Sequence, residues 1–234
     1  MPLGTVTAIL VIATVLVGCG LADRMAPAPE GARYRCNDFA FDPTLVDLPG
    51  GAEPDGDDPR ALTLQEHLRQ PGEPESLPDA GWHLVGFDAN RAEYVAKSND
   101  GYASVTLELR DGAWTVAGWG GCDPELVLPG DARAATWDLA PDAPVPNRVS
   151  TSITVLVSER SCASGQPPGD RIVGPQIVTE PAVIRIAFGV RPLPGGQDCQ
   201  GSPPGRVLVD LGQPIGDRLI SDFGIWPPIN IWGP

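Results

Sequence analysis

The clearest pattern in the chain is an alternation of apolar and polar residues between positions 102 and 110. One set of alternate positions is apolar throughout: Ala103, Val105, Leu107 and Leu109. The positions between them carry hydroxyl or charged side chains: Ser104, Thr106, Glu108 and Arg110. Because successive side chains of a β-strand point to opposite faces, this pattern predicts a strand with one buried face and one face in water.

Three further strand-like runs flank this one, and turn-forming residues separate them. The four runs are Trp82–Phe87, Ala92–Lys97, Tyr102–Arg110 and Ala113–Trp119. The last two are joined by Asp111-Gly112, and glycine in such a pair readily adopts the positive φ that a tight hairpin turn needs. The spacing therefore predicts a four-strand antiparallel meander.

A short helix is predicted ahead of this sheet, from Pro59 to about Arg69. Either Asp57 or Asp58 suits the N-cap, proline is favoured at the first helical position, and a Pro-Gly pair ends the helix. Its apolar positions share one face: Ala61, Leu64 and Leu68. We expect this face to cover the apolar side of the meander, as in an α+β unit, with His67 on the solvent-facing or half-buried side of the helix.

Beyond residue 130 the pattern changes to short strands separated by glycine and proline, with no helical period. The strand candidates are Thr136–Leu139, Thr151–Ser158, Arg171–Thr179, Ala182–Val190, Arg206–Leu211 and Arg218–Ser221. Such strands are typical of a β-sandwich. We therefore expect a mostly β protein, with an α+β domain at 36–130 and a small β-sandwich-like domain at 131–234. The final segment, Phe223–Trp232, is either a strand that folds back across the sandwich or a partner-binding tail.

Composition and charge narrow the class of protein. The 234 residues include 28 glycines and 27 prolines, more than average usage, and these coincide largely with the predicted turns. A hydrophobic content of 42% argues for a folded chain rather than a disordered one. The net charge of −14 argues against nucleic acid as a partner, because affinity for phosphates comes from basic residues.

The amino terminus carries an uncharged apolar run, Thr5–Val17, that ends at Leu16-Val17-Gly18-Cys19. The run is shorter than the roughly 20 residues of a bilayer span and fits the core of a signal peptide. Its last four residues resemble the lipobox of bacterial lipoproteins. The resemblance implies a signal peptide at 1–18, a lipidated Cys19, a tether at 19–35 and attachment to the extracytoplasmic face of the cell membrane. A plain secretory signal, an uncleaved anchor and an ordinary buried segment are the alternatives.

The remaining cysteines are even in number, as expected for disulfides in an oxidising compartment: Cys36, Cys122, Cys162 and Cys199. Four cysteines allow three pairings. We favour Cys36–Cys122 with Cys162–Cys199, because each bridge then lies within one predicted domain. Zinc is the alternative use, but the chain has no C-x-x-C pair and only two histidines, so no metal site is predicted.

A second resemblance covers residues 160–220. The segments 161–165 (SCASG), 190–204 (VRPLPGGQDCQGSPP) and 209–218 (VDLGQPIGDR) are similar to a module in exported proteins of high-GC Gram-positive bacteria. A chain in which Lys97 is the only lysine suits that source. The resemblance implies an extracytoplasmic β-rich module and supports the Cys162–Cys199 bridge. It implies no activity, and therefore no catalytic or binding residue.

Catalytic templates find no match in the chain. The motifs G-x-S-x-G, S-x-x-K and H-E-x-x-H are absent, and so are the phosphate-binding glycine loops. Asp55-Gly56-Asp57-Asp58 lacks the register of a calcium loop and is interpreted as a solvated loop and helix cap. His67 and His83 have ordinary structural explanations. No catalytic residue and no cofactor is predicted, and whether the protein is an enzyme stays open, with the balance against it.

Tryptophans are the better lead to a binding function: Trp82, Trp114 and Trp119 all lie on the predicted meander. Trp114 and Trp119 are five residues apart in one strand and are expected to face opposite sides. Packing in the core explains both most simply, although one of them is available to stack on a sugar or an apolar partner. We therefore expect a cell-envelope lipoprotein that binds or scaffolds, with an envelope protein or cell-wall glycan as partner. The alternative is an extracytoplasmic hydrolase of envelope glycans or peptides.

Overall fold

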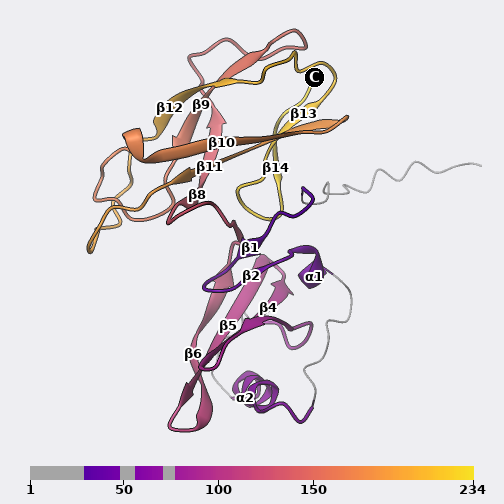
Figure 1. The fold of residues 1–234 in the computed structure, drawn as a ribbon, viewed down its shortest axis with the longest axis vertical. Helices are drawn as coiled ribbons and strands as arrows, with labels where there is room; N and C mark the ends of the chain where they lie inside the picture. The colour runs from indigo at the N-terminus through magenta and orange to yellow at the C-terminus, as the bar shows by residue number, and fades with distance from the viewer. Residues whose placement is uncertain (1–28, 48–55, 71–76) are drawn as a thin grey trace, which may run out of the picture.

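The computed structural model describes residues 29–47, 56–70 and 77–234, which build a mostly β structure in two parts (Figure 1). One part is a four-strand sheet with a helix, and the other is a larger, curled sheet. The predicted signal peptide, Cys19 and the first part of the tether lie outside the described residues.

The four predicted strands of the meander are present in the expected order. They are β3 (His83–Phe87), β4 (Arg91–Ser98), β5 (Gly101–Arg110) and β6 (Ala113–Cys122), and each pairs antiparallel with the next. Asp111 and Gly112, between β5 and β6, have φ values of 52° and 80°. Both values lie in the left-handed region that a two-residue hairpin turn requires, so the predicted hairpin is confirmed.

Helix α2 (Pro59–Leu68) covers one face of this sheet. Asp58 is its N-cap: the side chain accepts a hydrogen bond from the backbone N–H of Arg60 at 2.9 Å, and Pro59 takes the first helical position. Leu64 packs into a core formed with the apolar side chains of the meander: Trp82, Ala92, Tyr94, Ala96, Ala103, Val105 and Leu107. The hydrophobic effect acting on these side chains is the main force that holds α2 on the sheet.

One irregularity in β6 decides which way its tryptophans point. The pairing with β5 shifts by one residue at Ala117, which forms a β-bulge. Before the bulge Trp114 pairs with Leu109, and beyond it Trp119 pairs with Val105. Residues directly opposite each other in an antiparallel pair share a face. Trp114 and Trp119 therefore lie on the same face, the one that α2 covers. The expectation of opposite faces is wrong because the extra residue offsets the odd spacing.

The second part contains seven strands and one short 3-10 helix. They are β8 (Arg133–Leu139), β9 (Ser152–Ser158), η1 (Gly169–Arg171), β10 (Ile172–Thr179), β11 (Val183–Val190), β12 (Gly205–Asp210), β13 (Leu219–Asp222) and β14 (Ile229–Trp232). Their order in the sheet is β12-β9-β8-β11-β13-β14, and β10 also pairs with β11. All pairs are antiparallel except β11 with β13. The final segment thus folds back as a strand, β14, which pairs with β13.

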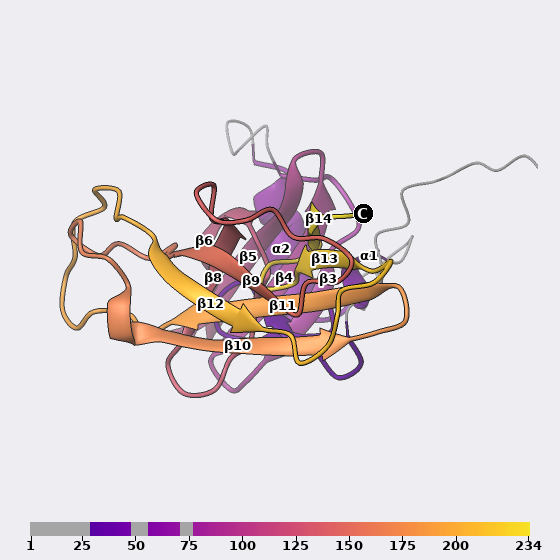
Figure 2. The same ribbon diagram turned by 90° about the horizontal axis from the view of Figure 1, so that it is seen from above.

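Strand β8 gives this sheet its sandwich-like form. Its first half pairs with β11 and its second half pairs with β9. A strand that changes partners midway carries the sheet from one layer to the other. The inward faces enclose one apolar core, whose larger members are Trp137, Val155, Ile184, Ile186, Phe188 and Ile220. Figure 2 views this part from above, with the meander behind it.

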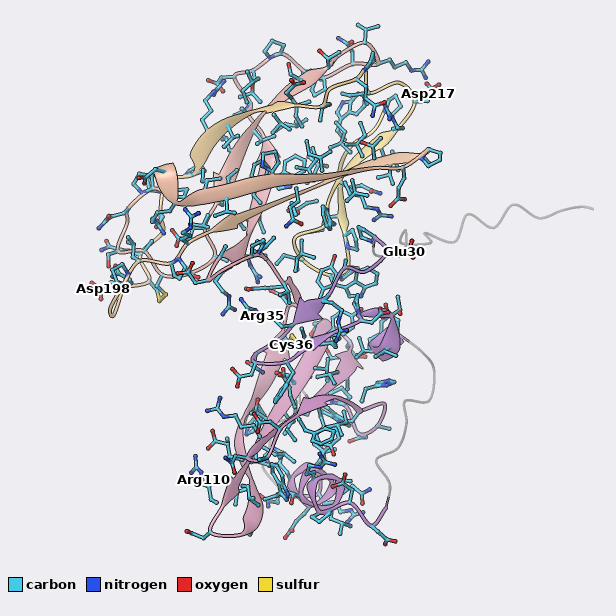
Figure 3. All side chains as sticks on the ribbon, in the orientation of Figure 1. Glu30, Arg35, Cys36, Arg110, Asp198 and Asp217 are labelled. Atoms are coloured by element: carbon cyan, nitrogen blue, oxygen red, sulfur yellow. A yellow bond between two sulfur atoms is a disulfide. The ribbon has the colours of Figure 1, made fainter. Side chains whose placement is uncertain are left out.

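The segment 29–47 lies between the two parts, which the sequence did not predict. It forms β1 (Tyr34–Arg35), β2 (Ala40–Phe41) and α1 (Thr44–Asp47), and β1 pairs with both β2 and β7 (Glu125–Leu126). Arg35 and Cys36 mark this level in Figure 3. One apolar cluster includes residues from this segment and from both larger sheets: Tyr34, Phe41, Val46, Val95, Tyr102, Ala187, Phe223 and Trp226. Contacts therefore cross the predicted domain boundary near residue 130, which itself stays a prediction.

A buried carboxylate anchors this segment to the meander. Glu93 of β4 accepts hydrogen bonds from the backbone N–H groups of Asn37, Asp38 and Phe39, at 3.1, 3.2 and 3.3 Å. Burial raises the pKa of this carboxyl group, and the donors oppose that effect. Because three successive backbone N–H groups donate to this one side chain, Glu93 fixes the path of the chain between β1 and β2.

Two disulfides connect distant segments. Cys36 bonds to Cys122 at the end of β6, with 5.6 Å between their Cα atoms. Cys162 bonds to Cys199, with 4.4 Å between their Cα atoms, and joins the loop after β9 to the loop before β12. The structure thus contains the pairing favoured from the sequence.

Candidate ligand-binding site

The three tryptophans of the meander differ in exposure. Trp82 is 4% exposed and its Nε1 donates to the Pro78 carbonyl at 2.8 Å, so it is a core residue. Trp114 is half-buried and packs against the core under α2. Trp119 is 45% exposed. Of the three residues predicted for binding, Trp119 is the one whose side chain is open to a ligand.

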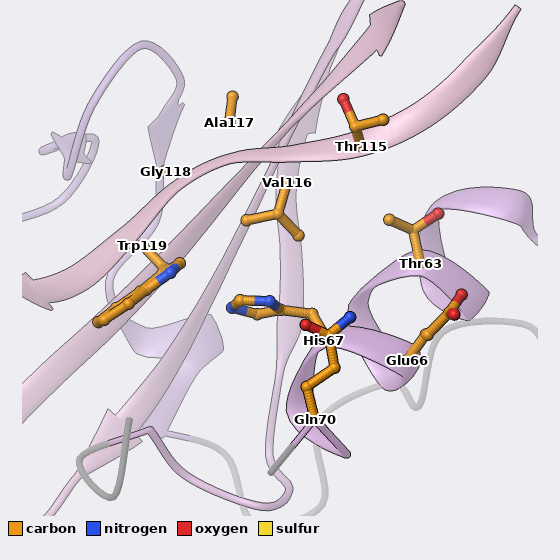
Figure 4. A pocket seen from close by; sticks show the side chains of 9 residues that line it. All are labelled: Thr63, Glu66, His67, Gln70, Thr115, Val116, Ala117, Gly118 and Trp119. Atoms are coloured by element: carbon orange, nitrogen blue, oxygen red, sulfur yellow. The ribbon is translucent and has the colours of Figure 1, made fainter. Parts of the chain in front are cut away.

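Trp119 forms one wall of a pocket between α2 and β6, with a volume of about 470 Å³ (Figure 4). Strand β6 supplies Thr115, Val116, Ala117, Gly118 and Trp119 to the lining. The opposite wall consists of Thr63, Glu66, His67 and Gln70. The volume lies within the range of roughly 300–1,000 Å³ that is usual for small-molecule sites.

The helical wall follows from the spacing of its residues. Thr63, Glu66, His67 and Gln70 are related by i, i+3, i+4 and i+7, so that their side chains form a single stripe along α2 and the turn that follows it. On the sheet side, the bulge at Ala117 places Trp119 opposite this stripe. The pocket thus depends on two local features, a helical period and a bulge, that lie far apart in the sequence.

His67 is the most deeply buried polar residue of the pocket. It is 6% exposed, so the expectation of a solvent-facing or half-buried position is wrong: the helix is turned so that His67 joins Ala61 and Leu64 against the sheet. Its ring lies beside that of Trp119, with the ring centres 6.1 Å apart and the planes at 43° (Figure 4). Its Nε2 atom is buried and has no hydrogen-bond partner among the described residues. An unpaired buried polar atom costs about 1–3 kcal/mol of stability.

The other polar side chains of the pocket fall into two groups. Two hydroxyls are already engaged: Thr63 Oγ1 donates to the Pro59 carbonyl at 2.9 Å, and Thr115 Oγ1 donates to the Glu108 carbonyl at 3.2 Å. The side chains of Glu66 and Gln70 make no hydrogen bond to another described residue. These two groups are free to bind a polar ligand, whereas His67 Nε2, although unpaired among the described residues, is buried.

The described lining residues include few groups of the kinds that catalyse hydrolysis. Glu66 is the only carboxylate among the described lining residues, and they include no serine or cysteine. Within residues 29–47, 56–70 and 77–234, no cluster of histidine, cysteine and acidic side chains has the arrangement of a metal site. His83 is half-buried on β3, outside this lining, and burial lowers its pKa.

Comparisons with protein-family models, curated proteins and solved structures found no match for this chain. In the part of the chain that the structure describes, no helix has the length and apolar character to cross a membrane. The interpretation of the site therefore depends on its own geometry.

Proposed function

We propose that this protein is a lipid-anchored envelope protein that binds a ligand in the pocket between α2 and β6. The observation that carries the proposal is the pair Trp119 and His67: an exposed indole beside a buried imidazole whose Nε2 has no partner in the described part of the chain. Large apolar side chains at the surface of a pocket, next to unsatisfied polar groups, are typical of ligand sites.

Exposure of Trp119 has a free-energy cost that binding would recover. Burial of an aromatic side chain of this size is favourable, and tryptophan is among the residues that contribute most to binding energy at interfaces. In the meander the other two tryptophans are buried or half-buried, and α2 already covers the same face. A ligand that covers the Trp119 ring would recover this cost.

The membrane location in the proposal depends on the lipobox-like Leu16-Val17-Gly18-Cys19 and on the disulfides. Both disulfides suit an oxidising compartment outside the cytoplasm. The second resemblance, over residues 160–220, supports export as well. The resulting picture is a pocket held at the extracytoplasmic surface by two acyl chains on Cys19 and a short tether.

Hydrolysis is the second candidate function, and the pocket supports it less well. A glycosidase of the usual kind requires two carboxyl groups flanking the scissile bond, about 5–10 Å apart. A hydrolase with a covalent intermediate requires a nucleophile next to a base. The described lining residues contain one carboxylate and one histidine, but neither a second acid nor a nucleophilic serine or cysteine.

Affinity capture from the native envelope tests the proposal. The full-length protein is expected to retain a ligand or partner that Trp119→Ala loses. Leu208→Ala is the matched control, because Leu208 is an apolar residue 71% exposed on β12, in the other sheet. Cys19→Ala is expected to move the protein from the membrane to the soluble fraction. Equal capture by the wild type and Trp119→Ala would contradict ligand binding at this pocket. An unchanged membrane fraction for Cys19→Ala would contradict lipid anchoring through Cys19.

A further inference from the structure

We propose that the pocket between α2 and β6 binds a neutral glycan, with one pyranose ring stacked on the indole of Trp119. This inference rests on the proposed binding function and names the chemical class of its ligand. It follows from three features of the pocket: an accessible aromatic face, polar groups around it, and the charge of the protein.

The aromatic face favours a flat, partly apolar ligand. A pyranose whose hydroxyl groups are equatorial presents its axial C–H groups on one side as a flat apolar surface, which packs on an aromatic ring. Trp119 offers such a surface, being 45% exposed. The next residue on the same face of β6 is Gly121, and an added side-chain carbon there would meet no atom within 4 Å. No side chain at this position hinders a ring from lying beside the indole.

The polar groups match the edge of a sugar ring. A hydroxyl both donates and accepts hydrogen bonds, so a site for several hydroxyls needs both kinds of partner. Glu66 supplies a carboxylate acceptor, and Gln70 supplies an amide with both a donor and an acceptor. These two side chains come from α2 and the turn after it, while Trp119 comes from β6 (Figure 4). A ring stacked on Trp119 would therefore have polar partners along the side that faces the helix.

His67 is the group that a hydroxyl ligand would satisfy. Its Nε2 is buried beside the Trp119 ring and has no partner among the described residues. Because Nε2 is buried, a ligand reaches it only when a side chain beside it moves, and the proposal therefore includes a turn of the Trp119 indole on binding. A sugar hydroxyl could then hydrogen-bond this nitrogen, so that stacking on Trp119 and pairing with His67 would occur together. An entirely apolar ligand would leave the imidazole unpaired.

Charge argues against anionic ligands. The chain has a net charge of −14, and among the described lining residues the pocket has one acidic side chain, Glu66, and no lysine or arginine. A phosphate-bearing or carboxylate-bearing polymer would be repelled. A quaternary ammonium group, which the indole and Glu66 would also attract, has no N–H to donate to His67 Nε2 or to the amide oxygen of Gln70. A neutral glycan is the ligand class that uses all four groups.

Calorimetric titration of the full-length protein in detergent micelles with cellohexaose and chitohexaose tests the inference. Saturable binding of at least one of these oligosaccharides is expected. Trp119→Ala is expected to weaken it about tenfold or more. His67→Phe keeps an aromatic ring but removes Nε2, and Gln70→Ala removes an exposed amide; each is expected to weaken binding several-fold. Leu208→Ala is expected to bind as the wild type does. Circular dichroism of each variant confirms that it is folded.

The possible results distinguish a failure of the glycan inference from a failure of the proposed binding function. In one result, neither oligosaccharide binds at millimolar concentration while capture from the envelope still depends on Trp119. That result would contradict the glycan as ligand but not the proposed binding function. Trp119-dependent binding of tetramethylammonium without oligosaccharide binding would show a cation site instead. Oligosaccharide binding that is equal in Trp119→Ala and the wild type would overturn the glycan site at this pocket. Loss of Trp119-dependent capture as well would overturn both proposals.

Discussion

At the scale of single residues, the structure gives unusual environments to polar side chains that looked ordinary in the sequence. Glu93 lies on a β-strand among apolar neighbours, and only the approach of residues 37–39 supplies its donors. From the sequence, His67 was expected on the solvent-facing or half-buried side of the helix, and only packing against the sheet buries its Nε2. Asp222 is 4% exposed, and its Oδ1 accepts a hydrogen bond from the Gly224 N–H at 2.8 Å.

Asp222 is expected to make the stability of the protein depend on pH. Burial raises the pKa of this carboxyl group from 3.8 to about 7. The folded state therefore binds more protons than the unfolded state between about pH 4 and pH 7, so the free energy of unfolding falls as pH rises through that window. Asp222→Asn removes this contribution, which amounts to about 4 kcal/mol at most. The free energy of unfolding of the variant minus that of the wild type is therefore expected to be larger at pH 7.5 than at pH 4.5.

Urea unfolding at the two pH values measures this difference. Asp131→Asn is the control, because Asp131 is exposed. Its difference from the wild type is expected to be the same at both pH values. If the difference between Asp222→Asn and the wild type were also the same at pH 4.5 and pH 7.5, Asp222 would not be the titrating group.

At the scale of elements, local patterns were sufficient for the strands and α2, but not for the irregularities that build the site. The alternation of residues 102–110 and the Asp-Gly turn predicted β5 and its hairpin with β6. The bulge at Ala117 could not be predicted from the sequence. In a bulge, two residues of one strand lie opposite one residue of its partner, which is a property of the pairing and not of either strand alone. One shifted residue was enough to move Trp119 to the face that α2 covers.

The N-cap of α2 provides a prediction at this scale. The sequence left Asp57 and Asp58 as equal candidates, and the structure selects Asp58, whose carboxylate also pairs with the Arg60 guanidinium at 2.6 Å. Asp58→Ala is expected to lower the free energy of unfolding by about 1 kcal/mol, since the first turn then loses its acceptor. Because α2 forms one wall of the pocket, ligand binding is expected to weaken as well.

Asp57→Ala is the matched control for this variant. Asp57 is exposed and precedes the cap, so its loss is expected to change stability by less than about 0.5 kcal/mol. Thermal unfolding of both variants measures the difference. Equal destabilisation by the two substitutions would show that the cap is not specific to Asp58.

At the scale of the whole molecule, the two parts share a core that neither sheet builds alone. Trp226, from the segment between β13 and β14, is the centre of it: Nε1 donates to Tyr102 Oη at 2.9 Å and to Asp47 Oδ2 at 3.2 Å. Its ring also packs edge-on against Tyr34, with 5.7 Å between ring centres. The carboxyl-terminal segment thereby contacts both α1 and β5, which are distant in sequence.

Trp226→Phe is expected to destabilise the whole molecule rather than one sheet. The variant keeps an aromatic ring but loses the indole donor, and the expected loss is about 2 kcal/mol. Urea unfolding followed by far-ultraviolet circular dichroism and by fluorescence is expected to show one shifted transition in both signals. Trp232→Phe, at a half-buried position on β14, is the control with a smaller expected effect. Separate midpoints for the two signals in the wild type would indicate that the two parts unfold independently.

The sequence by itself predicted the four strands of the meander, most strands of the larger sheet and helix α2, because each depends on a local period or a turn residue, and it favoured one of three cysteine pairings. The tertiary structure alone decided the position of segment 29–47, the burial of His67 and the face on which Trp119 lies. These features depend on contacts between residues that are tens of positions apart in the chain. A local sequence pattern does not show which distant residue a side chain will contact. The candidate pocket belongs to this second class, since it exists only where the stripe of α2 meets the bulge of β6.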